Sequence, residues 1–230
     1  MSDTATFKSH LHKVCTAVIQ KCSWILRTFN CRSTPFMKFM WKRLVQGHID
    51  YCSQLYMPNQ TAELRQLENL QKCFTKKIPE LRDLNYWQRL SHLKMNSQER
   101  RLERYRIIYT WKILEELVPN CGLKVTNSDR RGREVCIPPL KGSSSIRKLR
   151  DQSFQVNGPK LFNCLPPAFR KISKVSVEQF KEKLDLFLTN IPDEPNVDGL
   201  TPGACDPFTA APSNSIIDQS GKLKTRRPGA

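Results

Sequence analysis

LNYWQRLSHLKMNSQERRLERYRIIYTWKIL (residues 84–114) combines a strong helix signal with a large excess of positive charge. It carries seven Lys or Arg residues against two Glu residues, and five Tyr or Trp residues stand among them. In a helix, residues that recur every three or four positions form one apolar stripe, here Leu102, Tyr105, Tyr109 and Ile113. Four arginines fall mostly outside this stripe, and we expect much of their charge to face solvent or a polyanion: Arg100, Arg101, Arg104 and Arg106.

The apolar periodicity extends toward the N-terminus and predicts two further helices there. The first covers residues 7–29. The second begins at Ser33 or Thr34 followed by Pro35, because a proline is well tolerated in the first helical turn. This helix could continue until Pro58 stops it. Its inward face is expected to consist of Phe36, Met40 and Leu44.

Three more helical segments complete the first half of the chain. One runs from residue 59 or 61 to residue 78, where Pro79 ends it. A short one begins at residue 83 or 85 and buries Trp87. The long basic helix begins at residue 96 or 97 and ends before Pro119.

The helical pattern fails between residues 121 and 150, where glycines, prolines and serines interrupt it and cations continue. We interpret this segment as a basic loop with one short strand around residues 135–137. A second short strand is predicted at residues 154–156, ended by the turn dipeptide Asn157–Gly158. Pro159 then opens a short helix.

A capping box, Ser176 with Gln179, starts the last helix, which should bury Phe180 and Leu184. Beyond it the chain is rich in Pro, Gly, Ser, Thr and Asp, a composition typical of disorder. The predicted fold is mainly α: an irregular helical bundle with a basic loop, room for one short β-hairpin, and a disordered C-terminal tail. The predicted parts are a helical region 1–120, a basic loop or linker 121–150, a small C-terminal helical element 151–189, and the tail 190–230.

The positive charge is concentrated in the part expected to fold. The chain of 230 residues has a net charge of +17, and residues 1–189 hold 34 Lys or Arg against 16 Asp or Glu. An anionic partner would relieve this self-repulsion, and nucleic acid is the commonest one. The nine cysteines form no CxxC pair, and there is neither a secretory signal nor an apolar run of about 18 residues. These features predict reduced thiols in a nuclear or cytoplasmic protein without a membrane partner.

No set of residues indicates catalysis. The chain lacks an adjacent Asp–Asp pair, a GxxxxGK[ST] phosphate loop and a GxSxG nucleophile motif. One group resembles metal ligands: His10, His12, Cys15 and Cys22. Structural zinc normally takes ligand pairs from two segments, so we interpret this group as an ordinary amphipathic helix that carries cysteines. We therefore predict no catalytic residue, no metal and no cofactor.

Cations without nearby acids favour contact with a phosphate backbone, independent of base sequence. The simpler alternative is a solvated helix face with internal pairs such as Glu103 with Arg106. Aromatic residues among the cations could stack on unpaired bases, although such residues more often belong to the core. The predicted nucleic-acid-binding residues are Lys76, Lys77, Arg100, Arg101, Arg104, Arg106, Arg130, Arg131, Arg133, Arg147, Lys148 and Arg150.

Several blocks in order resemble the C-terminal region of reverse transcriptases from non-LTR retrotransposons, the jockey-like and chicken-repeat-type LINE elements. The resemblance covers about residues 5–190, and KSHLHKVCTAVIQKCSWILRTF (8–29) looks like the stretch directly after the polymerase palm. The other blocks are LVQGHIDYCSQLYMP (44–58), LENLQKCFTKKI (67–78), the stretch 84–114, SFQVNGPKLFNCLPPAFRKI (153–172) and SVEQFKEKLDLFL (176–188). Tyr56 stands where the family usually has tryptophan.

The resemblance implies the thumb and post-thumb helices, which in such polymerases grip the template–primer backbone. The [FY]xDD turn of the palm and the apurinic-type endonuclease domain of the family are absent from this chain. The implied function is that of a non-catalytic fragment with residual, non-specific binding of RNA or an RNA–DNA hybrid. The alternatives are a helical interaction module that self-associates through exposed apolar helix faces, a retroelement remnant without function, and, least favoured, an active polymerase or nuclease.

Overall fold

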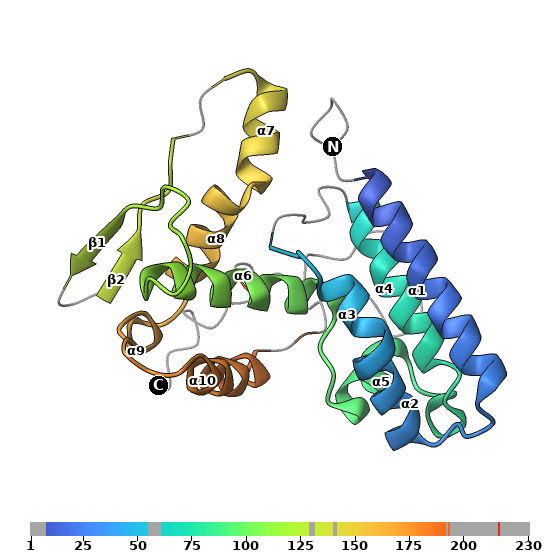
Figure 1. The fold of residues 1–230 in the computed structure, drawn as a ribbon. Helices are drawn as coiled ribbons and strands as arrows, with labels where there is room; N and C mark the ends of the chain where they lie inside the picture. The colour runs from blue at the N-terminus through green and yellow to red at the C-terminus, as the bar shows by residue number, and fades with distance from the viewer. Residues whose placement is uncertain are drawn as a thin grey trace, which may run out of the picture. The chain divides into compact units, whose positions relative to one another are not determined.

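The computed structural model describes residues 8–54, 61–128, 132–139, 142–191, 193 and 216. Within these ranges the chain is mainly helical with one antiparallel hairpin, which confirms the predicted fold class (Figure 1). The chain forms two compact units, Met1–Arg101 and Leu102–Ala230, each of which is described by itself. Their boundary falls inside helix α6 (Gln98–Leu114), whereas the sequence placed the end of the helical region at residue 120.

Helix α1 (Lys8–Thr28) confirms the predicted first helix. It buries Leu11, Val18 and Ile25 and packs against α4 (Thr61–Thr75), which lies beside it in Figure 1. The carbonyl groups at its C-terminal end need partners, because the helix offers them none. Arg32 supplies them: its Nη2 donates to the Leu26 carbonyl at 2.5 Å, and its Nη1 donates to the Phe29 carbonyl.

The second helical segment starts at Ser33 with Pro35 in its first turn, as predicted, but its inward face is not the predicted one. Helix α2 (Thr34–Met40) passes through a π-helical turn, η1 (Trp41–Val45), into α3 (Gln46–Asp50). The buried side chains lie one position further along: Met37, Trp41, Val45 and Ile49. These four residues are each four positions apart, and in a regular α-helix of 3.6 residues per turn such a row drifts around the helix. A π turn holds more residues than an α turn, so the row stays on one side here. The predicted Phe36, Met40 and Leu44 are only partly buried.

The predicted continuation of this segment to Pro58 is wrong. Helix α3 ends at Asp50 because Tyr51 is extended and Cys52 takes a left-handed backbone conformation with φ 54°. Residues 55–60 lie outside the described part.

Helix α4 buries Leu67 and Phe74, and Ile78 beyond its end is buried as well. A 3₁₀ turn, η2 (Pro79–Leu81), leads to α5 (Tyr86–Leu93). A capping box starts α5: Asn85 accepts from the Gln88 N–H at 2.8 Å, and Gln88 accepts from the Asn85 N–H at 3.0 Å. Trp87, predicted to be buried here, is only partly so.

The second unit contains the hairpin, whose strands are β1 (Val125–Ser128) and β2 (Gly132–Val135). They pair antiparallel, with Val125 opposite Val135. The strand predicted at 135–137 is therefore placed three residues earlier. The backbone of Val135 is held from outside the hairpin, because its N–H donates to the Asn163 side chain at 3.0 Å and its carbonyl accepts from it at 2.8 Å.

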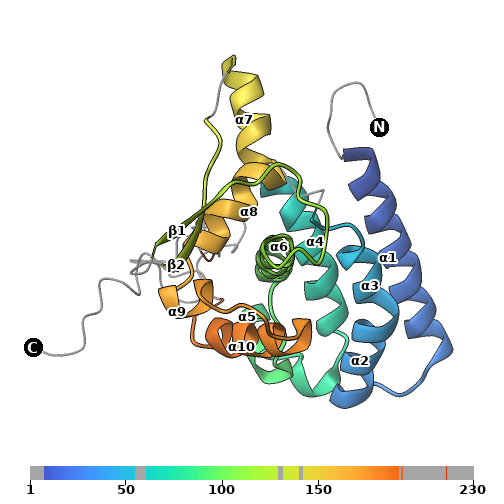
Figure 2. The ribbon, with the colours of Figure 1, turned by 60° about the vertical axis from the view of Figure 1, so that its left-hand side comes forward.

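Two predictions after the hairpin are wrong. Helix α7 (Ser144–Gln152) occupies part of the predicted loop, and it leads into α8 (Phe154–Asn163) with only Ser153 between them (Figure 2). The predicted strand at 154–156 and its Asn–Gly turn are thus parts of one helix. Close packing explains this, since a Cβ on Gly158 would lie 2.8 Å from Thr110 Oγ1 of α6. The turn preference of Asn–Gly is overridden by a helix contact that requires glycine.

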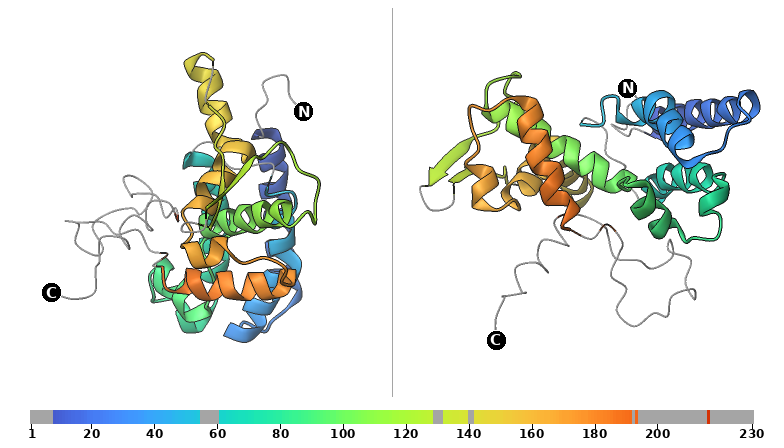
Figure 3. Two further views of the ribbon diagram at one scale, coloured as in Figure 1. Left: turned by 90° about the vertical axis from the view of Figure 1, so that its left-hand side faces the viewer. Right: turned by 90° about the horizontal axis from the view of Figure 1, so that it is seen from below.

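Helices α9 (Pro167–Arg170) and α10 (Val177–Thr189) complete the unit. The capping box at Ser176 and Gln179 forms as predicted, and Phe180 and Leu184 are buried. Helix α10 crosses α6 (Figure 3), and the rings of Trp111 on α6 and Phe180 on α10 stack with centroids 4.3 Å apart.

The predicted disordered tail, residues 190–230, lies mostly outside the described residues, but two of its members are buried in the second unit. Ile191 follows α10, and Ile216, 0% exposed, belongs to the same apolar cluster as Trp111 and Phe180. The Ile216 N–H donates to Glu103 Oε2 at 2.7 Å. Ile191 and Ile216 are thus packed positions within the predicted tail.

We expect Ile216→Ala to destabilise the second unit by about 2–4 kcal/mol, because it removes a fully buried aliphatic side chain. Hydrogen exchange measured by mass spectrometry should show faster exchange at residues 107–113 and 180–188. Leu186→Ala is the control, since Leu186 is 71% exposed and should change exchange little. Unchanged protection in Ile216→Ala would contradict the placement of this residue.

Candidate nucleic-acid interface

The arginines of α6 do not form an exposed basic face. Arg100 is 1% exposed and Arg106 is 0% exposed, so the prediction that they face a polyanion is wrong. The physical reason is that α6 is covered on most of its sides: Gln98, Glu103 and Thr110 are buried, and so are Leu102, Ile107, Ile108, Trp111 and Ile113. Of the predicted apolar stripe, Tyr105 and Tyr109 are only partly buried, so the stripe was predicted correctly only at Leu102 and Ile113.

The two remaining arginines of this helix form ion pairs with carboxylates of other elements. Arg101 forms an ion pair with Asp50 at the end of α3, with 2.6 Å between Nη2 and Oδ2. Arg104 donates to both oxygens of Asp185 on α10, and its Nη2 lies 2.7 Å from Oδ2. The Arg101–Asp50 pair is partly buried, whereas Asp185 is about half exposed. Both guanidinium groups are nevertheless matched by carboxylates within their own units.

Arg133, another predicted binding residue, is also used internally. Its guanidinium forms an ion pair with Glu115 at 2.5 Å, and its Nε donates to the Arg170 carbonyl at 3.0 Å. Glu115 in turn accepts from the Lys174 N–H at 2.7 Å. Arg133 therefore joins β2 to the residue that follows α6 and to the C-terminal end of α9.

Burial determines the electrostatics of Arg106. Desolvation lowers the pKa of this guanidinium to about 10, and the neighbouring Glu103 carboxylate opposes the shift. Glu103 is itself buried, and it also accepts the Ile216 N–H. An ion left in a protein interior without its counter-ion is strongly destabilising, so Arg106 and Glu103 depend on each other.

We expect Arg106→Gln to destabilise the protein by about 3–5 kcal/mol, because the Glu103 carboxylate would lose its buried counter-charge. Urea unfolding followed by circular dichroism measures this change. Lys183→Gln is the control on an exposed position of α10 and should stay within about 0.5 kcal/mol. A stable Arg106→Gln protein with weakened nucleic-acid binding would instead support the surface role that the sequence suggested.

A buried polar network holds the first unit together. The Glu68 carboxylate accepts from the Tyr86 hydroxyl and from the Gln98 N–H, the latter at 2.9 Å. The Gln98 side chain donates to Gln71 and accepts from Gln46 at 3.2 Å. Because these groups are buried, each hydrogen bond removes a desolvation penalty.

The network reaches the π turn through Gln46. The Trp41 indole N–H donates to Gln46 Oε1 at 2.6 Å, and Gln46 Nε2 donates to Asp50 Oδ1 at 2.9 Å. These two bonds span η1 from its first residue to the end of α3. They stabilise the backbone conformation of this segment.

The other predicted binding residues differ in their placement. Lys76 and Lys77 are exposed after α4, and Arg147 and Arg150 are exposed on α7. Arg130, Arg131 and the side chain of Lys148 lie outside the described part. For the exposed residues, contact with nucleic acid remains a prediction.

An acid-free segment at the N-terminal side is the feature that the sequence analysis missed. Residues 4–49 contain no Asp or Glu, and they hold eight Lys or Arg. The segment spans α1, α2, η1 and most of α3. Its exposed cations are Lys13, Lys21, Arg27, Lys42 and Arg43. The signal that would have revealed it is the run of residues without an acid, not the local density of arginine.

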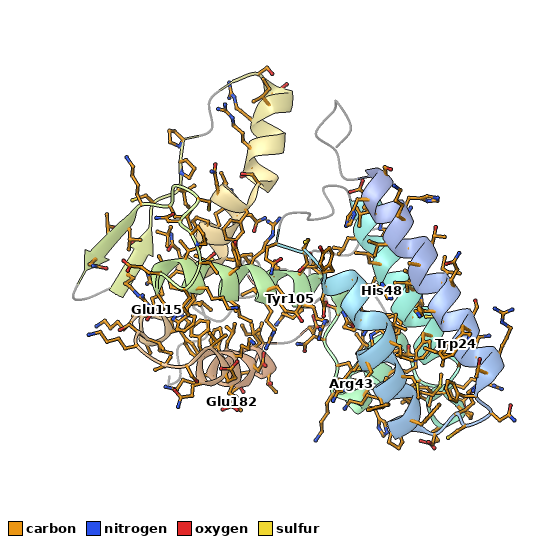
Figure 4. All side chains as sticks on the ribbon, in the orientation of Figure 1. Trp24, Arg43, His48, Tyr105, Glu115 and Glu182 are labelled. Carbon is orange, nitrogen blue, oxygen red and sulfur yellow. The ribbon has the colours of Figure 1, made fainter. Side chains whose placement is uncertain are left out.

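Two of these cations lie over aromatic rings. Lys21 Nζ is 5.8 Å from the ring centroid of Trp24 on α1, and the Arg43 guanidinium carbon is 5.7 Å from that of Phe39. Figure 4 shows Trp24 on α1 and Arg43 on the α2–η1–α3 segment. The pattern of cations beside partly exposed rings suits a polyanion that also carries flat bases.

The cysteines show no sign of a metal site. Among the described residues no group of three or more His, Cys, Asp or Glu could hold a metal ion, so His10, His12, Cys15 and Cys22 are not brought together as ligands. The described cysteines are free thiols. Burial raises the pKa of Cys22 to about 12, and the nearby Cys73 adds to the shift. A hydrogen bond to the Ser33 hydroxyl lowers the pKa of the exposed Cys31.

We expect iodoacetamide at pH 8 to alkylate Cys31 well before Cys22, because the thiolate is the reactive form. Rising pH should speed the reaction of Cys31 first, since its pKa lies below the ordinary value. A time course of peptide mass spectra measures both rates in one sample. Equal rates would contradict the burial of Cys22.

No helix in the described ranges is long and apolar enough to cross a membrane. Comparison of the chain with protein-family models, with curated proteins and with solved structures finds no match. The candidate interface is therefore argued from its own charges and geometry.

Proposed function

We propose that this chain is a non-catalytic part of a non-LTR retrotransposon reverse transcriptase and binds the backbone of RNA or an RNA–DNA hybrid without sequence preference. The observation that carries the binding proposal is the acid-free segment 4–49, whose exposed cations lie on α1 and η1. The resemblance of the sequence blocks supports the family, and the absence of [FY]xDD supports a non-catalytic role. The expected location is the nucleus or the cytoplasm.

The distribution of charge supports this location of the interface. Arginines of α6 are matched internally by Asp50, Asp185 and Glu103. In the described part of the chain, Lys13, Lys21, Lys42 and Arg43 form no ion pair with a carboxylate, so their charge is available to an external anion. Binding to phosphates releases condensed counter-ions, and this makes such binding strongly dependent on salt.

The test is a titration of a fluorescein-labelled 20-residue RNA–DNA hybrid at two salt concentrations, followed by anisotropy. The variant Lys38→Gln/Lys42→Gln/Arg43→Gln should weaken binding about tenfold or more and reduce the salt slope by about two to three, because each phosphate contact contributes close to one unit. The absence of binding by the unaltered protein at low salt would reject the proposal.

The matched control removes the same charge from the second unit, with Lys171→Gln/Lys181→Gln/Lys183→Gln. Lys181 Nζ lies 3.9 Å from Glu178 Oε1, and Glu182 lies between Lys181 and Lys183 on α10, so part of their local field is compensated. The control should bind nearly as well as the unaltered protein. An equal loss in both variants would indicate that only net charge matters.

A helical interaction module is the second candidate. The observation that favours it is apolar exposure on α1, where Ile19 and Trp24 are exposed on the same helix. Self-association through this face would appear as a mass above 26.7 kDa in light scattering. A monomer at every concentration would exclude it.

A further inference from the structure

Phe39 is an exposed aromatic residue in the middle of the acid-free segment. Its side chain is 53% exposed on α2, although the neighbouring Met37 and Trp41 are fully buried. Arg43 follows four residues later and thus lies on the same side of the helical segment, with its guanidinium carbon 5.7 Å from the ring centroid. One side of the ring therefore carries a cation, and much of the ring remains open to solvent.

Two lysines share this surface. Lys38 and Lys42 are four residues apart, and Lys42 is three residues from Phe39. Burial lowers the pKa of Lys42, and the nearby charges of Lys38 and Arg101 lower it further. Within the described chain, neither lysine nor Arg43 forms an ion pair with a carboxylate. Positive charge is thus gathered around an exposed ring, where an anion would relieve the repulsion.

Buried contacts on the inner side of this helical segment hold its backbone in place. Trp41, at the start of the π turn, is buried and donates to Gln46 at 2.6 Å. Its ring also lies 5.1 Å from that of Phe74 on α4. A ligand would therefore meet an ordered surface and lose little free energy in ordering it. π turns frequently mark functional positions in helices.

We infer that Phe39, with Arg43 beside it, is a stacking site for an unpaired base of single-stranded nucleic acid, and that Lys38 and Lys42 contact the flanking phosphates. The ring offers a flat apolar surface, and the guanidinium extends this surface and adds charge. Bases inside a duplex are already stacked and paired, so only an unpaired base can use it. This inference rests on the proposed function and adds the part of the ligand that is recognised.

The experiment compares two labelled ligands with the full chain: a ten-residue oligo(dT) and a ten-residue abasic oligomer with the same phosphates. The unaltered protein should bind oligo(dT) more tightly. Phe39→Ala should weaken binding of oligo(dT) about fivefold or more and leave binding of the abasic oligomer unchanged. Phe39→Leu should show the same loss, because it keeps apolar bulk but removes the aromatic face. Phe39→Trp should retain the tighter binding of oligo(dT), because it keeps an aromatic face.

Leu186→Ala is the control, since it removes an exposed apolar side chain from α10 and should change neither affinity. Binding of both oligomers by the unaltered protein, with no effect of Phe39→Ala on either, would overturn the stacking site and leave backbone binding intact. Failure to bind either oligomer or the hybrid at low salt would overturn both proposals. A variant that loses oligo(dT) and abasic binding equally would assign Phe39 a purely structural role and reject the inference.

Discussion

Three arginines of α6 are matched by carboxylates of the protein itself, and this matching determines which cations are left to face solvent. A charged side chain in a protein interior is tolerated only beside a counter-charge or hydrogen-bonding partners. Arg101 binds Asp50 at the end of α3, Arg104 binds Asp185 on α10, and Arg106 lies beside Glu103. The helix that looks most like a binding surface in the sequence therefore serves mainly to position other elements.

This internal use of charge changes where an anionic partner would bind. Cations with nearby acids contribute little to the external field, whereas cations in a segment without acids contribute fully. The acid-free segment 4–49 lacks acids of its own, and it exposes Phe39 on α2 and Arg43 on η1. The buried hydrogen bond between Trp41 and Gln46 links the interior of the first unit to this surface. The two proposals depend on this division between structural and exposed cations.

Local signals predicted individual elements well where one pattern dominated. The helix at 8–28 follows from its apolar spacing, and the starts of α5 and α10 follow from side chains that cap their own first turns. Prediction failed where a distant contact outweighed a local preference. Gly158 belongs to a helix because it packs closely against Thr110, 48 positions earlier in the chain, although Asn157–Gly158 is a strong turn signal.

The sequence by itself determined the mainly helical class, several helix boundaries and the excess of positive charge, because these depend on composition and on residues within one or two turns of each other. Only the tertiary structure decided which cations are exposed, since Asp50 and Asp185 are far from their arginine partners along the chain. It also decided that η1 shifts the buried face to Met37 and Trp41, because a π turn changes the number of residues per turn without a local signal that names it.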